Sequence, residues 1–127
     1  MTENAIAKEI VDAAFRIHTT LGPGLLESVY HAIMLHELQK RGLVVEFEKP
    51  VPVVWDEIQL DVGFRADLIV VHKLILELKS VEQIAKVHKK QLLTYMRLTN
   101  CHLGLLINFG TELIKDGISR VVDKLEE

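Results

Sequence analysis

The chain has 127 residues, enough for one domain with a single hydrophobic core. Hydrophobic residues make up 49% and charged residues 26%, which excludes an intrinsically disordered chain, and no apolar run reaches the roughly eighteen residues of a membrane span. The formal net charge of −3 excludes a protein that coats nucleic acid by charge alone, and counts only mildly against other proteins that act on nucleic acid.

The cysteine content and the N-terminus indicate a reducing compartment. Cys101 is the single cysteine, so an intrachain disulfide and any site built from several cysteines are excluded. The N-terminal segment carries acids in an amphipathic pattern instead of a basic stretch followed by an apolar one, so we expect no secretory signal. We therefore expect a cytoplasmic protein.

Two helices are predicted at the start of the chain. Residues 3–19 form the first, capped by Thr2, and Gly22-Pro23-Gly24 ends it. The second runs over residues 25–40, with Gly42 as its C-terminal cap. The side chains expected to face the core are Ile6, Ile10, Ala13, Ala14 and Ile17 from the first helix and Leu26, Val29, Ile33 and Leu38 from the second.

Strands dominate the middle of the chain. Residues 43–55 look extended, and Pro50 and Pro52 place part of this segment at a sheet edge or a kink. The apolar runs at 68–71 and 74–76 predict a central hairpin within residues 63–79.

A third helix and a further strand follow the hairpin. The helix is expected over residues 82–98 and a buried strand over 103–109, while residues 110–127 give no clear pattern. The helix is long enough for a crossover between parallel strands. Its expected core positions are Ile84, Val87, Leu92, Tyr95 and Leu98. The order α-α-β-β-β-α-β predicts one α/β (α+β) domain over residues 1–127, a mixed sheet flanked by helices.

The hairpin carries charged side chains whose geometry depends on its loop. Glu77 and Lys79 share one strand face, while Leu78 points to the other. A two-residue loop would turn Asp67 away from Glu77, whereas a three-residue loop or a bulge would bring both acids to one face. Charges on an apolar strand are costly to bury unless something compensates them, and a divalent cation would do so. Without a metal, converging carboxylates repel, and at least one pKa rises.

Two motifs in this order resemble a known group. Asp67, followed by Glu77-Leu78-Lys79 in a strand hairpin framed by helices, is similar to the PD-(D/E)xK nuclease superfamily, although Arg65-Ala66 stands where the named proline would be. Gly24-Leu25-Leu26-Glu27-Ser28-Val29-Tyr30 matches the signature of its GxxExxY family. The resemblance covers most of the chain and implies a restriction-endonuclease-like core.

The resemblance also implies roles for individual residues. Asp67, Glu77, Glu27 and the backbone carbonyl of Leu78 would ligate Mg²⁺, with Mn²⁺ as a substitute, and Lys79 would contact the scissile phosphate or help to activate water. Carboxylates and a carbonyl are oxygen ligands of the kind Mg²⁺ takes. Gln91 matches a glutamine that related nucleases carry among their catalytic residues. Gln91, Tyr95 and Tyr30 are further candidates for substrate contact.

Each of these residues also has a structural explanation. Glu77 and Lys79 could be an exposed pair on an edge strand, and Glu27 could sit in the first helical turn for the helix dipole alone. Tyr30 could belong to the core, and Trp55 is expected to serve packing. The histidines show no metal-ligand spacing, and the basic face of the third helix, formed by Lys86, Lys89, Lys90 and Arg97, could be solvated surface or a phosphate contact.

Two functions remain open from sequence. The first is a Mg²⁺-dependent nuclease that hydrolyses phosphodiester bonds, favoured because the acids and the lysine are all present. The second is a non-catalytic nucleic-acid-binding or protein-interaction module of the same fold, favoured by the acidic pI and small size; a subunit of a repair or defence complex is a weaker third. As partners we expect nucleic acid, DNA ahead of RNA, no membrane, and a homodimer as an option.

Overall fold

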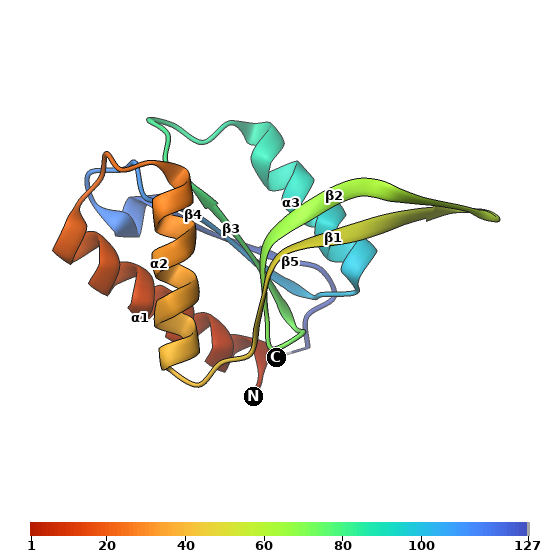
Figure 1. The fold of residues 1–127 in the computed structure, drawn as a ribbon, viewed down its shortest axis with the longest axis horizontal. Helices are drawn as coiled ribbons and strands as arrows, with labels where there is room; N and C mark the ends of the chain where they lie inside the picture. The colour runs from red at the N-terminus through yellow and green to blue at the C-terminus, as the bar shows by residue number, and fades with distance from the viewer. Residues whose placement is uncertain (127) are drawn as a thin grey trace.

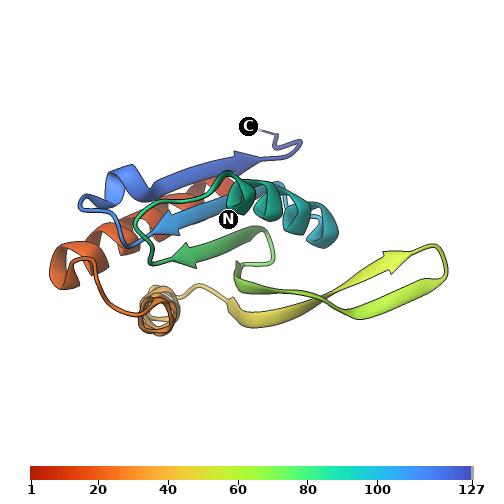
Figure 2. The same ribbon diagram turned by 90° about the horizontal axis from the view of Figure 1, so that it is seen from above.

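Five strands form one mixed sheet with helices on both faces, as Figures 1 and 2 show for the computed structural model. The structure describes residues 1–126, apart from the side chain of Val62. The elements are α1 (Glu3–Leu21), α2 (Glu27–Lys40), β1 (Val45–Trp55), β2 (Ile58–Val70), β3 (Leu74–Lys79), α3 (Lys86–Thr99), β4 (Leu103–Asn108), the 3₁₀ helix η1 (Ile114–Gly117) and β5 (Ile118–Val122). The predicted fold class is confirmed.

The strands lie in chain order across the sheet, β1-β2-β3-β4-β5. β3 and β4 pair in parallel through the α3 connection, as the crossover prediction requires, and the other neighbours pair antiparallel. β5 was not predicted, because its short apolar pairs are interrupted by Ser119 and Arg120. None of the described helices is both long enough and apolar enough to cross a membrane.

The helices α1 and α2 cover one face of the sheet. The Thr2 hydroxyl caps α1 by accepting from the backbone N–H of Ala5 at 3.1 Å, and the predicted apolar stripe of α1 is buried. In α2 the prediction was partly wrong. Leu26 is exposed because it precedes the helix, and Val29 is exposed because the buried stripe of α2 runs along the Tyr30 and Met34 side. The buried residues of α2 are Tyr30, His31, Met34, Glu37 and Leu38.

The helix α3 covers the opposite face. It begins at Lys86, later than predicted, and buries Leu92 and Met96. Gly104 on β4 permits this close approach, because a Cβ there would lie 2.7 Å from the Met96 sulfur. Val87 and Leu98 were expected in the core and are instead exposed, since they lie on the outer side of the helix.

The strand β3 contributes side chains to the hydrophobic cores on both faces of the sheet. Leu74, Leu76 and Leu78 belong to the core beneath α1 and α2, whereas Ile75 belongs to the core beneath α3. Because side chains alternate along a strand, Glu77 faces the α3 side with Ile75. The Glu77 carboxyl group is therefore buried between the sheet and α3.

A two-stranded arm projects from the sheet. β2 pairs with β3 only over Leu68–Val70, so the preceding part of β2, from Ile58, pairs with β1 alone. Figure 1 shows this hairpin extending well beyond the helices. Trp55 lies at its tip and is 72% exposed, so the packing role expected for it is not found.

Candidate active site

The β2–β3 connection sets which side chains share a face. Val70 pairs with Leu74, which leaves a three-residue loop over residues 71–73. Val71 and His72 take positive φ values of 54° and 59° to close it. The odd-length connection required to bring Asp67 toward Glu77 is confirmed.

Asp67 lies where β2 and β3 separate. Regular pairing of the two strands stops at Leu68 and Leu76, and the Asp67 carboxylate accepts the backbone N–H of Leu78 at 2.9 Å. His31 on α2 places its Nε2 3.3 Å from the same Oδ2, within ion-pair distance. The acid is therefore held from two directions, by a neighbouring strand and by a helix.

Glu77 is a buried acid with an unsatisfied oxygen. Its residue is 8% exposed, and among the described residues its Oε1 has no hydrogen-bond partner. Burial, followed by hydrogen bonding to and repulsion from Asp67, raises the pKa of Glu77 to about 9. The expectation that converging carboxylates raise one pKa is confirmed, and Glu77 is protonated at neutral pH.

The neighbouring pKa shifts agree with one shared electrostatic environment. Burial opposes ionisation of Asp67, but the nearby His31 ring, the Glu77 carboxyl group and the Leu78 N–H together lower its pKa. The Asp67 contact raises the pKa of His31. Burial, then the charges of Glu77 and Asp67, raises the pKa of Tyr95. Asp67 is thus the ionised member of the acid pair.

Lys79, at the end of β3, forms an ion pair with Glu27 at the start of α2. The Lys79 Nζ lies 4.0 Å from the Glu27 Oε1, and both side chains are partly exposed. The Ser80 hydroxyl donates to the Leu25 carbonyl at 2.7 Å, which holds the start of α2 against the end of β3. Among residues 1–126, no three His, Cys, Asp or Glu side chains come close enough to share a cation. The structure therefore does not group Glu27 with Asp67 and Glu77.

A cavity of about 130 Å³ opens beside these groups. It brings together five of the candidate residues, Asp67, Glu77, Lys79, Gln91 and Tyr95. Tyr95 also stacks on Phe64 of β2, with ring centroids 3.7 Å apart. The remaining lining residues are Arg65, His88 and Leu106.

Tyr30 does not contact this cavity. Its hydroxyl donates to the Gly22 carbonyl at 2.6 Å and accepts from the Leu25 N–H at 3.2 Å, and its ring stacks on Phe109 at 4.4 Å. The side chain is fully buried. The substrate contact expected for Tyr30 is therefore not what the structure shows, since the residue orders the loop ahead of Glu27.

Three residues near the acids were missed by sequence reasoning. His31 was given no role from its spacing, and the structure buries it 3.3 Å from the Asp67 carboxylate. One signal was its position four residues after Glu27, which puts both on one side of the helix. Arg65 shares its strand parity with Asp67, and His88 lies one turn before Gln91.

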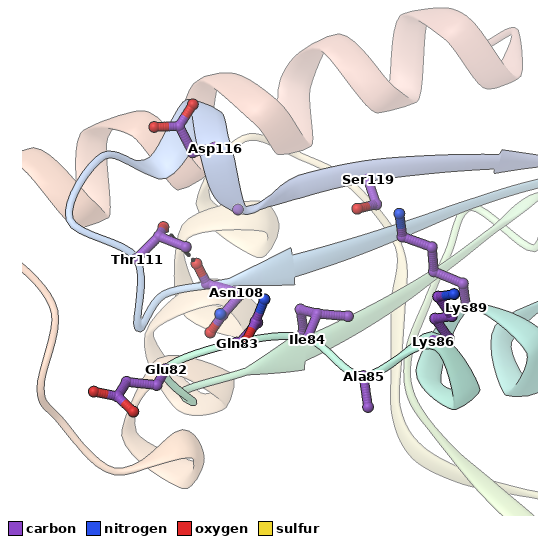
Figure 3. Close-up of a pocket in the computed structure, with 11 residues that line it drawn as sticks. Glu82, Gln83, Ile84, Ala85, Lys86, Lys89, Asn108, Thr111, Asp116 and Ser119 are labelled. Atoms are coloured by element: carbon purple, nitrogen blue, oxygen red, sulfur yellow. Dashed lines mark hydrogen bonds between the residues drawn. The ribbon is translucent and has the colours of Figure 1, made fainter.

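A separate hollow of about 280 Å³ lies beyond the end of β3, and Figure 3 shows its lining. Asn108 belongs to it, but its side chain is fully engaged: its oxygen accepts the N–H groups of Val81 and Gly110, and its amide donates to the Val81 carbonyl. This hollow contains none of the candidate site residues, and its polar centre ties the ends of β3 and β4 together.

The donor set at the acid pair fits a divalent cation. Two carboxylates face one small cavity, and the buried Glu77 Oε1 has no protein partner. Hard cations such as Mg²⁺ take one or two carboxylates together with water and phosphate oxygens.

One comparison with known proteins gives a match. A family model described as the PD-(D/E)XK nuclease superfamily matches residues 4–121, from α1 into β5. No curated protein and no solved structure matches the chain.

Proposed function

The chain belongs to the PD-(D/E)XK nuclease superfamily, and on that premise we propose that it is a Mg²⁺-dependent nuclease centred on Asp67, Glu77 and Lys79. The segment Gly24–Tyr30 resembles the signature of the GxxExxY family, which supports a proposed assignment to that family. The observation that carries the proposal is the meeting of an ionised and a protonated carboxyl group at one cavity that Lys79 also lines.

Asp67 and Glu77 would hold the cation, with the Leu78 carbonyl as a further oxygen ligand. Mg²⁺, or Mn²⁺ in its place, would lower the pKa of a water molecule and offset charge on the phosphate. Glu77 must lose its proton when the ion binds, because a ligating carboxyl group is ionised. The N–H of Leu78 and the ring of His31 keep Asp67 aimed at the site during this exchange.

Lys79 supplies the positive charge directed at the substrate. It shares a strand face with Glu77, so its ammonium group reaches the same cavity. There it would stabilise the negative charge that develops on the phosphate oxygens. Glu27, 4.0 Å from the ammonium, would act through its ion pair with Lys79 and not as a ligand beside Asp67 and Glu77.

Gln91 and Tyr95 form the α3 wall of the cavity, and we assign them to substrate contact. The Gln91 amide can donate to a phosphate or a base, while Tyr95 is fixed by its stack on Phe64. We propose DNA as the substrate.

The test joins metal binding with cleavage. Titration calorimetry with Mn²⁺ and Mg²⁺ is run on the wild type, Asp67→Ala and the control Asp61→Asn, which changes an exposed acid on the same strand. Cleavage of plasmid DNA, single-stranded DNA and RNA is measured alongside. We expect binding and DNA cleavage in the wild type and Asp61→Asn, and neither in Asp67→Ala.

Two outcomes would change the conclusion. Metal binding that depends on Asp67, without cleavage of any nucleic acid, would favour the non-catalytic module. Equal metal binding by the wild type and Asp67→Ala would place the ion elsewhere and overturn the proposed centre.

A further inference from the structure

The tip of the β1–β2 arm exposes a cluster of large apolar side chains. Val54 is 60% exposed, Trp55 72%, Ile58 57% and Leu60 50%. All four lie on the part of the hairpin that pairs with no third strand, where Trp55, Ile58 and Leu60 share one face and Val54 lies on the other. We call these residues the arm tip.

A two-stranded arm with exposed apolar side chains contributes little to the stability of the fold by itself. A two-stranded hairpin in water is marginally stable by itself, and contiguous exposed apolar surface marks an interaction site. The base of the arm is anchored, since Phe64 stacks on Tyr95 of α3, but the arm tip has no such anchor. A partner that covers the arm tip would stabilise the hairpin.

The charges of the arm tip argue against nucleic acid as that partner. No lysine or arginine occurs between Lys49 and Arg65, whereas Asp56, Glu57 and Asp61 all do. A phosphate backbone attracts cations and would be repelled by these acids. The partner surface should therefore be apolar and positively charged.

The chain itself carries such a surface at the base of the arm. A groove of about 270 Å³ between β1 and the end of α3 is lined by Pro50, Val51, Pro52 and Leu98. The outer side of α3 also exposes Lys90 and Arg97, and Arg97 lies 3.8 Å from Asp123 in a partly exposed ion pair. The acid Glu46 and the base Lys49 at this groove are paired with each other. We call this surface the arm base.

We propose that two copies of the chain form a twofold dimer in which each arm tip lies in the partner's arm base. Two hairpins side by side and antiparallel bring the tip of each to the base of the other, so both contacts form at once. Trp55 and Ile58 would fill the proline-lined groove, and Asp56 and Glu57 would face Lys90 and Arg97. The inference does not depend on the nuclease activity.

The apolar contact is tested by measuring mass against concentration in analytical ultracentrifugation. The wild type is expected to dimerise, and Trp55→Ser with Ile58→Ser is expected to raise the dimer dissociation constant at least tenfold. Val44→Ser removes an equally exposed apolar side chain outside the arm tip and is expected to leave it unchanged. Circular dichroism confirms that each variant is folded.

The charged contact is tested by reversal. Asp56→Lys with Glu57→Lys, and separately Lys90→Glu with Arg97→Glu, should each be monomeric, while an equimolar mixture of the two variants should form a heterodimer. This rescue requires the arm tip of one copy to meet the arm base of the other. A wild type that stays monomeric up to about 100 µM, or a dimer indifferent to both sets of changes, overturns the proposal.

Discussion

The backbone N–H of Leu78 donates to the carboxylate of Asp67 at 2.9 Å, so an acid side chain occupies the place where strand pairing between β2 and β3 stops. This contact joins fold and site. It satisfies a buried backbone donor and also fixes the carboxylate toward the cavity that Glu77 and Lys79 line.

Asp67→Ala should therefore destabilise the protein as well as remove metal binding. The Leu78 N–H loses its acceptor, and an unpaired buried donor costs about 1–3 kcal/mol in the free energy of unfolding. Asp67→Asn keeps a carbonyl oxygen at that place and should lose less stability while binding metal no better. Urea denaturation compares them, with Asp61→Ala as the control; equal stability of Asp67→Ala and wild type would contradict the account.

The metal-free protein should lose stability as pH rises. Glu77 has a folded pKa of about 9, above its ordinary 4.5, so between these values the folded state binds more protons than the unfolded state. The free energy of unfolding then falls with pH by at most about 1.4 kcal/mol per pH unit. The raised pKa of His31 adds in the same direction above pH 6.5.

Glu77→Gln should remove most of this pH dependence. The amide imitates the protonated acid, so the variant is expected to be at least as stable as the wild type at pH 8. Denaturation at several pH values measures the difference. A wild type whose stability is flat from pH 5 to 9 would show that Glu77 titrates normally.

Cation binding should release protons. At pH 7 the ion displaces the proton of Glu77, so about one proton should leave per ion bound, and the apparent affinity should rise up to tenfold per pH unit below pH 9. Calorimetry in buffers of different ionisation enthalpy counts the protons. Asp61→Asn should release as many, whereas a pH-independent affinity would argue that Glu77 is not a ligand.

Lys79→Met should separate catalysis from metal binding. The substitution removes the charge directed at the phosphate and should lower kcat by about 10²–10³-fold. Mn²⁺ affinity should change little, because Lys79 ligates nothing. Lys89→Met, on exposed α3 surface, serves as the matched control. Full activity of Lys79→Met would remove this residue from the mechanism.

Tyr30→Phe should affect stability more than metal binding. The hydroxyl bonds to Gly22 and Leu25 are lost, at a cost of about 1–2 kcal/mol, while the ring still stacks on Phe109. Mn²⁺ affinity should stay near the wild-type value. Thermal denaturation and calorimetry measure the two effects, and a large loss of substrate affinity with unchanged stability would restore Tyr30 as a substrate contact.

The sequence pattern of the β2–β3 hairpin was sufficient to predict the part of the site that this hairpin forms. Alternation along β3 and the parity of its loop predict that Asp67 and Glu77 can share a face, and the structure agrees. The parallel β3–β4 pair also followed from the length of the intervening helix.

The contributions from other layers could not be predicted in this way. His31 reaches Asp67 only because α2 crosses the sheet at that place; its spacing from Glu27 indicates a shared side of the helix but not this contact. Leu26 and Val29 look like core residues by their spacing, but Leu26 precedes the helix and α2 packs on the sheet through the side that carries Tyr30. A tryptophan such as Trp55 is usually packed in a core, yet it lies at the end of β1, where the arm projects from the rest of the sheet and leaves it exposed.

The three-residue connection at positions 71–73 also limits how this segment can be lengthened or shortened. Inserting or deleting one residue there would rotate Asp67 to the α1–α2 side unless a bulge absorbed the change, whereas adding two residues would keep it beside Glu77. Engineered loops and grafted tags at this place should therefore change its length by even numbers. In a set of such length variants, those changed by an even number of residues should retain Mn²⁺ affinity and those changed by an odd number should lose it, whatever the size of the change.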